Sequence, residues 1–326
     1  MRLPHLFLDR LCFGLSGPEE LLRVLGPLAS PGEDECIRRL CALDLPPVSS
    51  PRALAAMLGV SEGLVWSMLH RQHRHYRHFS IPKGRGSRDI TAPRVALKVI
   101  QKWLAVRLQA KYYRPGHVFG FVPGLSHIDA ARQHLGARWV CSFDIENFFP
   151  TTPEGLVAAR LVDLGFPESG AGIVARLACF SGVLAQGAPT SPVLSNIALC
   201  DIDQRLSLLA ERYSLRLTRY ADDIVFSGLE AVPDQLAREV YELFAASSWR
   251  LSEAKTERVE IPSRLKVHGL LVHGEEVRLT KAYRNRIRAY RYLMERNGIQ
   301  QADLPKVKGH LSFAESVRKA GGASFG

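Results

Sequence analysis

Two adjacent aspartates interrupt a pair of strand-like runs in the segment RLTRYADDIVFSG (216–228). Aromatic and β-branched residues stand on both sides of Asp222 and Asp223, a pattern that predicts an antiparallel hairpin with the acids near its turn. Because neighbouring carboxylates repel each other, an acid pair flanked by buried strands is costly to place without a function. The alternative for this segment alone is a solvated Asp-Asp turn.

A third acid lies at the end of another apolar strand, WVCSFD (139–144). If this strand neighbours the hairpin, Asp144 joins Asp222 and Asp223 at one place. Hard oxygen ligands of this kind suit Mg²⁺. Two such ions, about 3.5–4 Å apart, stabilise the attacking and leaving oxygens in phosphoryl transfer. The sequence therefore predicts three catalytic aspartates that bind two magnesium ions.

The remaining pattern alternates strands and helices, which is typical of an α+β fold with antiparallel strands and helices on one face. Strand-like pieces surround a Gly-rich basic turn in 79–93, and a long amphipathic helix follows from about Val95 to Lys111. Ser191 is the expected N-cap of a helix that starts at Pro192 and runs to about Leu209. Residues 265–280 predict a second hairpin turning at Gly274, and the last 45 residues are helical and basic.

Positive charge is distributed unevenly in this chain, whose net charge is +11. Residues 52–117 hold 13 Lys and Arg against two acids, and residues 278–326 hold 11 against three. Two basic blocks thus flank a middle that carries the clustered carboxylates. This distribution fits a protein that binds metals in its centre and a polyanion such as nucleic acid on both sides.

Other classes of protein are less consistent with the composition. No apolar run approaches the roughly 20 residues that span a bilayer, and the N-terminus does not resemble a signal peptide. The six cysteines are scattered without a CxxC pair, which fits a reducing cytoplasm. Cys141 and Cys200 stand in apolar surroundings and are expected in the core.

Residues 51–72 resemble a helix-turn-helix around Gly59, with Ser61 as the cap of the second helix. This pattern keeps open a different class of function, a DNA-binding regulator without catalysis. Such a regulator would not need the two acidic motifs, so this hypothesis ranks below an enzyme.

Three motifs together resemble prokaryotic reverse transcriptases, most closely those of the retron type. They are FDIENFF (143–149), QGAPTSPVLSN (186–196) and YADD (220–223), in the order and approximate separation seen in that family. The segments IPKGRGSRDITAP, HVFGFVPGLS and GHLSFAESVRK also resemble family segments, so the likeness covers roughly residues 50–320. The resemblance implies a right-handed polymerase fold, with an N-terminal helical segment (1–50), fingers (51–138), a palm with an antiparallel sheet (139–262), and a palm-end hairpin with a helical thumb (263–326).

The resemblance also implies roles for single residues. The Ile145 carbonyl would assist the three aspartates in binding metal. Phe149 would lie under the sugar and reject a 2′-hydroxyl, with core packing as the alternative. The other residues implied to contact the incoming nucleotide are Lys83, Arg88, Gln186, Gly187 and Lys255.

The implied reaction is attack of a primer hydroxyl on the α-phosphate of a dNTP, directed by an RNA template. For the retron type, the implied partner is a structured non-coding RNA that serves as template and primer. The product would be a branched RNA–DNA molecule that contains an RNA–DNA hybrid. The enzyme would take part in defence against phage, together with a possible effector protein. The alternatives are a non-retron defence enzyme and a group II intron relative, although no maturase-like extension follows residue 326.

Some positions depart from the retron pattern. The usual Asn of an Asn-Ala-x-x-His element is Ala130 here, while His134 is present, and Val-His-Gly (267–269) replaces Val-Thr-Gly. A catalytic-loop proline is replaced by Ala185. These differences do not involve the predicted metal ligands. They bear on whether the chain is of the retron type, not on whether it is a polymerase. His134 and His268 are expected to be buried and hydrogen-bonded.

A basic helix is predicted in KAYRNRIRAYRYL (281–293). At helical spacing Arg284, Arg288 and Arg291 share one face. Guanidiniums at this spacing can bind phosphates across an A-form groove, and Tyr283 or Tyr292 could stack on a base. We therefore expect this helix to bind a specific structured RNA, the alternative being a solvated basic face.

Overall fold

The computed structural model describes residues 7–84, 86–296 and 298–321, without the side chain of Lys83. The chain divides into two compact units that interleave along the sequence. The first unit comprises the described residues up to Arg114 together with Asn147–Asp201 and Ser247–Trp249. The second unit comprises Pro115–Glu146, Ile202–Ala246 and the described residues from Arg250 onward. The division of the chain into 1–50, 51–138, 139–262 and 263–326 remains a prediction.

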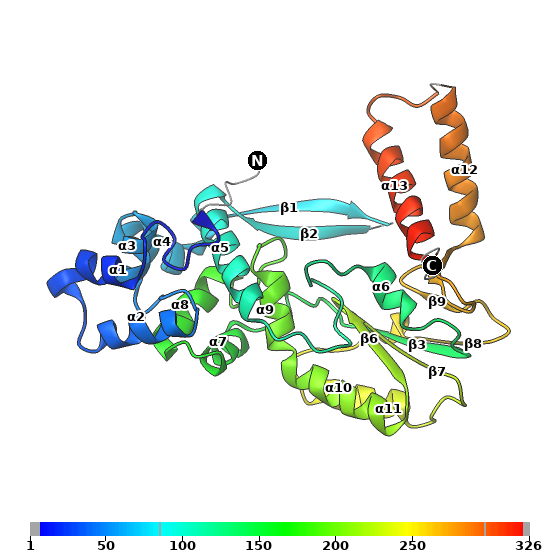
Figure 1. Cartoon of the computed structure of the whole chain (residues 1–326), viewed down its shortest axis with the longest axis horizontal. Helices are drawn as coiled ribbons and strands as arrows, with labels where there is room; N and C mark the ends of the chain where they lie inside the picture. The colour runs from blue at the N-terminus through cyan, green and yellow to red at the C-terminus, as the bar shows by residue number, and fades with distance from the viewer. Residues whose placement is uncertain (1–6, 85, 297, 322–326) are drawn as a thin grey trace, which may run out of the picture. The chain divides into compact units, whose positions relative to one another are not determined.

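The first unit is mainly helical, with one long hairpin (Figure 1). Its larger elements are α1 (Pro18–Leu25), α2 (Glu33–Ala42), α3 (Pro51–Leu58), α4 (Glu62–His70), β1 (Tyr76–Lys83), β2 (Gly86–Pro93), α5 (Val95–Lys111), α7 (Glu154–Asp163), α8 (Glu168–Ala178) and α9 (Ser191–Ala198). Its short elements are η2 (Gly26–Leu28), η3 (Gln72–Arg74), β4 (Cys179–Phe180) and β5 (Val183–Leu184). Buried side chains from these helices form one apolar core, which includes the fully buried Trp103.

Local sequence signals explain several helix ends in the first unit. Ser61 caps α4 as predicted, because its side chain accepts a hydrogen bond from the Leu64 amide. The bounds predicted for α5 are also confirmed. The predicted cap at Ser191 is wrong by one residue. Thr190 precedes α9, and the Ser191 hydroxyl instead donates to the carbonyl of Ala185 at 2.7 Å.

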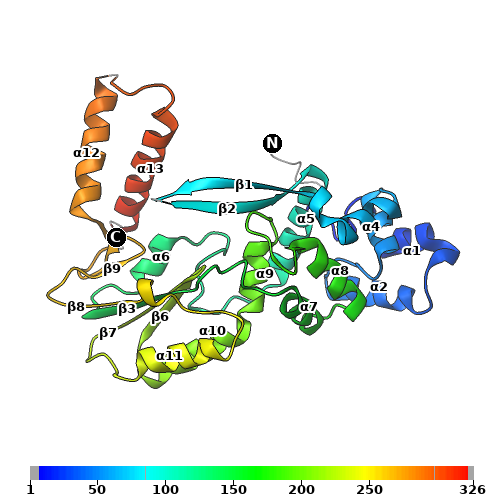
Figure 2. The same cartoon turned by 180° about the vertical axis from the view of Figure 1, so that it is seen from behind.

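The second unit is built on a four-stranded antiparallel sheet in the order β6-β7-β3-β8. Its strands are β3 (Trp139–Asp144), β6 (Arg216–Tyr220), β7 (Asp223–Gly228) and β8 (Glu257–Glu260). Its helices are α6 (His127–Arg132), most of α10 (Cys200–Arg212), α11 (Leu236–Ala245), η4 (Glu253–Lys255), α12 (Lys281–Glu295) and α13 (Leu304–Gly321). α10 and α11 lie side by side along the sheet, and α12 and α13 form an antiparallel pair (Figure 2).

Two details of the second unit differ from the sequence prediction. The expected hairpin of 265–280 is a three-stranded sheet of β9 (Lys266–Val267), β10 (Leu270–Leu271) and β11 (Arg278–Leu279). Gly274 lies in the second connection, and the first turn falls at His268 and Gly269, which both have positive φ. The single helix expected from Pro192 to Leu209 is divided at Leu199 into α9 and α10.

The cysteines are free within the described residues. Cys141 is buried as predicted, but Cys200 is exposed at the start of α10, so its expected core position is wrong. Among the described helices, none has both the length and the apolar composition needed to cross a membrane.

Candidate active site

The three predicted aspartates meet at one edge of the sheet in the second unit. Antiparallel pairing of β3 with β7 places Asp144 directly opposite Asp223, so their side chains share one face. Asp222 occupies the two-residue turn between β6 and β7, because Tyr220 pairs with Asp223. The amide of Ile145 donates to the carbonyl of Asp222 at 3.0 Å, which ties the end of β3 to this turn. Ile145 is buried, and a metal-binding role for its carbonyl remains a prediction.

Lys255 supplies a positive charge to this edge. Its ammonium lies 2.5 Å from Asp144 Oδ1, and the Asp144 side chain is only 13% exposed. Burial raises the pKa of Asp222, and the carboxylates of Asp223 and Asp144 raise it further, while Lys255 opposes them. One ammonium therefore leaves a surplus of negative charge among three carboxylates.

This surplus fits a divalent cation. Within the described part of the chain, no three His, Cys, Asp or Glu side chains are already arranged as a metal centre. Lys255 is bonded to an Asp144 oxygen that a metal ion would take. The donor set of hard carboxylate oxygens is nevertheless the one that Mg²⁺ prefers. The residues fit magnesium by their chemistry.

Of the two histidines expected to be buried and hydrogen-bonded, His134 meets both expectations, whereas the buried Nε2 of His268 has no hydrogen-bond partner among the described residues. His134 has no exposed surface and makes hydrogen bonds of 2.7 Å with the hydroxyls of Ser227 and Thr218. Burial lowers the pKa of His134 to about 3. The His268 side chain is 6% exposed, and its Nδ1 lies 3.5 Å from Asp223 Oδ2.

Sequence reasoning missed a buried ion pair below the acidic turn. Arg219 in β6 and Asp203 in α10 are both fully buried and bonded to each other. The available signal was an arginine within the strand-like run that precedes Asp222.

Five of the six predicted nucleotide-binding residues belong to the first unit, and Lys255 belongs to the second. The Gln186 carbonyl accepts the Thr91 amide at 2.8 Å, which ties the 185–188 loop to β2, the strand that carries Arg88. Gly187 has a φ of 124°, and a Cβ there would lie 2.9 Å from Ile90 Cγ2. The close approach that this glycine permits in the structure is to β2, and its approach to nucleotide and template remains a prediction.

Phe149, the predicted sugar gate, also belongs to the first unit. It is half-buried and stacks on Phe148, with ring centroids 5.4 Å apart. Lys83 ends β1, and its predicted contact with triphosphate falls on a side chain outside the described residues. The second unit thus brings together Asp144, Ile145, Asp222, Asp223 and Lys255, whereas Lys83, Arg88, Phe149, Gln186 and Gly187 belong to the first unit.

The basic face predicted for 281–293 forms on α12. Arg284, Arg288 and Arg291 are exposed, while Ile287 is buried. Tyr283 is half-buried between the two helices, since its hydroxyl lies 2.7 Å from His310 Nδ1 and its ring meets Phe313 edge-on. Its packing therefore disfavours base stacking. Tyr292 is 52% exposed, with the Arg296 guanidinium 4.5 Å from its ring centroid.

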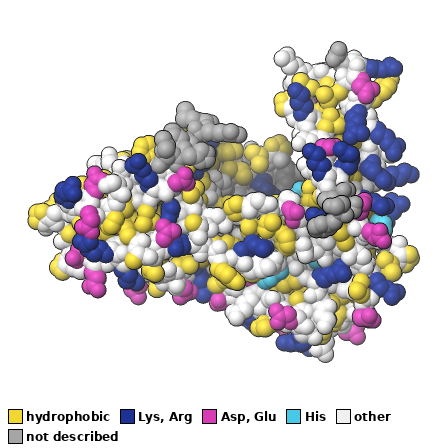
Figure 3. Space-filling model, in the orientation of Figure 1, with side chains coloured by type: hydrophobic (Ala, Val, Ile, Leu, Met, Phe, Trp, Pro, Cys, Tyr) yellow, Lys and Arg dark blue, Asp and Glu magenta, His cyan; other side chains and the backbone are white. Residues whose placement is uncertain are grey.

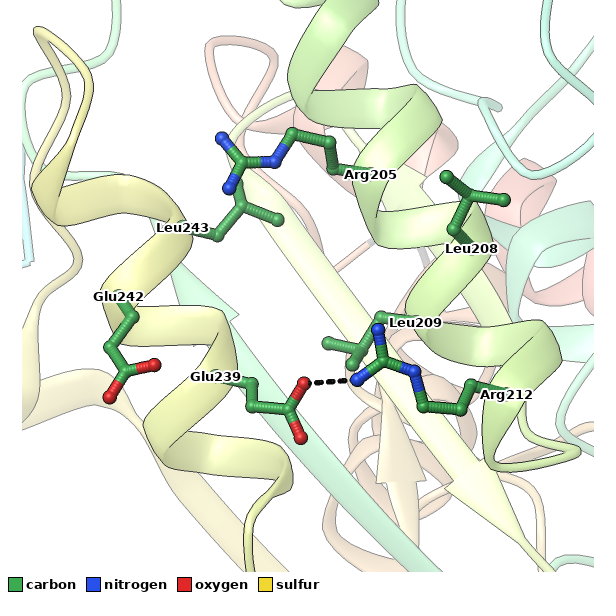
Figure 4. A pocket seen from close by; sticks show the side chains of 7 residues that line it. All are labelled: Arg205, Leu208, Leu209, Arg212, Glu239, Glu242 and Leu243. Carbon is green, nitrogen blue, oxygen red and sulfur yellow. Dashed lines mark hydrogen bonds and ion pairs between the residues drawn. The ribbon is translucent and has the colours of Figure 1, made fainter.

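Two other features are poor candidates for the site. A hollow of about 280 Å³ lies between α10 and α11 (Figure 4). α10 lines it with two arginines and two leucines, and α11 lines it with two glutamates and a leucine. Arg212 and Glu239 already pair across it at 2.7 Å. The helix-turn-helix of α3 and α4 is present, but the exposed side chains of α4 include no Lys or Arg for phosphate contacts.

Comparison with known proteins identifies the family to which this chain belongs. Residues 81–279 match the family described as reverse transcriptase (RNA-dependent DNA polymerase), which confirms the α+β polymerase fold predicted from the sequence. The retron Mx65 reverse transcriptase of Myxococcus xanthus is 32% identical over 86% of this chain and 71% of its own length. The retron Mx162 reverse transcriptase of the same organism is 30% identical over 88% of this chain and 68% of its own length. The retron Ec86 reverse transcriptase of Escherichia coli is 26% identical over 86% of this chain and 88% of its own length. This chain therefore belongs to the reverse transcriptases, the RNA-directed DNA polymerases, and among them to the prokaryotic retron type.

Proposed function

We propose that this chain copies a partner structured RNA into branched, RNA-linked single-stranded DNA. The observation that carries the chemistry is the meeting of Asp144, Asp222 and Asp223 at the end of β3 and the β6–β7 turn. Two Mg²⁺ ions held there would neutralise charge on the reacting phosphate. Asp144 and Asp222 would be the main ligands, with Asp223 beside them and the Ile145 carbonyl assisting.

The remaining roles concern substrate binding. Lys83 and Arg88 on the β1–β2 hairpin would hold the triphosphate, since guanidinium and ammonium groups pair with phosphate oxygens. Gln186 and Gly187 would lie against the nucleotide, and Phe149 under its sugar. Lys255 would pass from Asp144 to the triphosphate once metal neutralises the carboxylates.

The test of the chemistry is metal-dependent DNA synthesis on an RNA template annealed to a DNA primer. We expect dNTP incorporation with Mg²⁺, and its loss in Asp222→Asn. The matched control is Asp234→Asn, which removes the charge of an exposed aspartate in the same unit. Parental synthesis by a folded Asp222→Asn protein contradicts the assignment.

The proposed RNA-binding surface is the exposed face of α12. Figure 3 shows Lys and Arg side chains gathered where α12 lies in Figure 1. Arg284, Arg288 and Arg291 are all exposed on this helix. Arginines one and two turns apart can contact successive phosphates of an RNA helix, and the exposed Tyr292 could stack on an unpaired base. α12 carries only one acid, Glu295.

Recovery of bound RNA from the purified chain tests this part of the proposal. We expect one defined RNA with the parent protein and its loss when Arg284, Arg288 and Arg291 are changed to Glu. The control changes three exposed lysines of α13, Lys306, Lys308 and Lys319, to Glu, which reverses the same amount of charge. A heterogeneous RNA mixture unaffected by the α12 variant favours a non-retron enzyme with a solvated basic face.

The proposal extends to the setting in which such an enzyme works. From the resemblance to retron enzymes, we infer activity in the cytoplasm and a part in defence against phage, beside an effector protein. Deleting the gene in its host and challenging with phage tests this part, and unchanged phage sensitivity contradicts it.

A further inference from the structure

A buried arginine connects the core of the second unit to the acidic turn. Arg219 lies in β6, two residues before Ala221, and its side chain has no exposed surface. Its Nε donates to Asp203 Oδ1 at 2.7 Å and its Nη2 donates to Asp203 Oδ2 at 2.6 Å. Both carboxylate oxygens are thus engaged in one bidentate pair, a geometry that fixes the plane of the guanidinium.

The remaining arm of this guanidinium reaches the turn itself. Arg219 Nη1 donates to the carbonyl of Ala221 at 3.0 Å. Ala221 has a φ of 60°, a left-handed conformation that a residue with a Cβ adopts only at a cost. Asp222 is the next residue, so this hydrogen bond holds the peptide group from which the Asp222 backbone continues.

A second restraint acts on the other side of the turn. The amides of Phe119 and Gly120 donate to the Arg219 carbonyl at 2.9 and 3.3 Å. A Cβ on Gly120 would overlap the backbone nitrogen of Ala221, so only glycine permits this approach. The strained residue is therefore enclosed between the Gly120 backbone and the Arg219 guanidinium.

Stability alone is a weak explanation for this arrangement. Burial penalises the Asp203 charge, but Arg219 and His117 outweigh it and lower the pKa of Asp203, so the carboxylate stays ionised. Removing one partner of a buried ion pair is strongly destabilising, yet replacing both by apolar residues of similar volume is often neutral or stabilising. What an apolar pair would not supply is the hydrogen bond to Ala221.

We propose that Arg219 and Asp203 are a positioning pair that sets the conformation of the Ala221–Asp222 turn and so the placement of the catalytic carboxylate. This inference rests on the proposed catalytic role of Asp222. Asp203 orients the guanidinium, and the guanidinium holds the Ala221 carbonyl. Neither side chain contacts substrate in this role.

The decisive variant is the double change Arg219→Met with Asp203→Leu, because it leaves no unpaired buried charge. Arg219→Lys is the second variant. A lysine can donate to Asp203 but cannot form the bidentate pair and reach Ala221 at once. Each protein is measured for Tm, affinity for primer-template, kcat and KM for dNTP, and Mn²⁺ affinity by electron paramagnetic resonance without dNTP.

We expect kcat to fall about 10–100-fold in both variants, since small misplacements of a reacting group can cost about two orders of magnitude. The KM for dNTP and the affinity for primer-template should stay close to the parent values, and Mn²⁺ should bind more weakly. A folded double variant with parental kcat and Mn²⁺ affinity overturns the proposal. If the double variant does not fold, parental kcat and Mn²⁺ affinity in Arg219→Lys overturn it.

Asp222→Asn, assayed in parallel, separates this inference from the proposed function. Loss of synthesis in Asp222→Asn with parental behaviour of the pair variants rejects only the positioning role. Parental synthesis in Asp222→Asn rejects the catalytic role of Asp222 itself, and with it the inference that rests on it.

Discussion

Lys255 and Asp144 are 111 residues apart in the sequence and form an ion pair in which Nζ lies 2.5 Å from Oδ1. Among the described residues, Lys255 is the one Lys or Arg side chain that pairs with any of the three aspartates, and it pairs with Asp144. Its side chain is 55% exposed. This relationship makes Lys255 a residue whose removal should change the charge balance of the site.

We expect Lys255→Met to shift the acid limb of the pH–activity profile to higher pH. Lys255 lowers the pKa of Asp222 against the effects of burial and of Asp223 and Asp144. Without the ammonium, Asp222 protonates at a higher pH, so synthesis declines earlier as the pH falls. The kcat/KM for dNTP should also drop about 10-fold, the cost of one charge-assisted hydrogen bond. Lys308→Met on α13 is the control, and an unshifted acid limb contradicts the expectation.

Asp222→Asn should change activity and stability in opposite directions. The raised pKa of Asp222 means that its ionised form is disfavoured in the folded protein at neutral pH. Removing the charge relieves this cost, so Tm should rise while synthesis falls about 10²–10³-fold, as for loss of a strong electrostatic contact. Thermal unfolding at pH 7 beside primer-extension assays measures both. A lower Tm contradicts the electrostatic interpretation.

Phe149→Val should relax discrimination against ribonucleotides. The ring is half-buried beside Phe148, and a smaller side chain would leave room for a 2′-hydroxyl. We expect the preference for dNTP over rNTP to decline about 10–100-fold, since one steric contact contributes roughly 1–3 kcal/mol to selectivity. Single-nucleotide incorporation kinetics with matched dNTP and rNTP measure this ratio. Unchanged selectivity with a lowered Tm identifies Phe149 as a packing residue only.

His134 should make folding stability depend on pH. Its folded-state pKa of about 3 lies below the ordinary value of 6.5, so the unfolded chain binds the extra proton between these values. The stability that neutral His134 contributes is therefore present above pH 6.5 and declines as the pH falls toward 3. Between pH 7 and 5 the free energy of unfolding should decrease by about 2 kcal/mol from this group.

Urea unfolding of the parent and of His134→Asn at both pH values tests this expectation. The variant should lose most of that decrease, because asparagine does not titrate. His273→Asn changes an exposed histidine of the same unit and should leave the pH dependence as in the parent. An equal decrease in the parent and His134→Asn rules out His134 as the group responsible.

The features that were predicted correctly from the sequence are local ones, which depend on residues close together in the chain. The hairpin with Asp222 and Asp223 at its turn, the bounds of α5 and the Ser61 cap all follow from spacing and capping within one segment. The strand pattern of WVCSFD likewise placed Asp144 at a strand end. Local sequence patterns therefore identified the three acidic residues that meet in the second unit.

Long-range packing decided the rest. Lys255 reaches Asp144, and Arg219 reaches Asp203 and Ala221, only because β3 pairs with both β7 and β8 and α10 packs along the sheet. Such contacts depend on the summed burial of many side chains, which no single segment encodes, and a one-residue change of register would turn each acid to the other face. The sequence by itself determined which residues could do chemistry. Tertiary structure decided which buried and charged neighbours hold them, because only folding brings distant residues into contact.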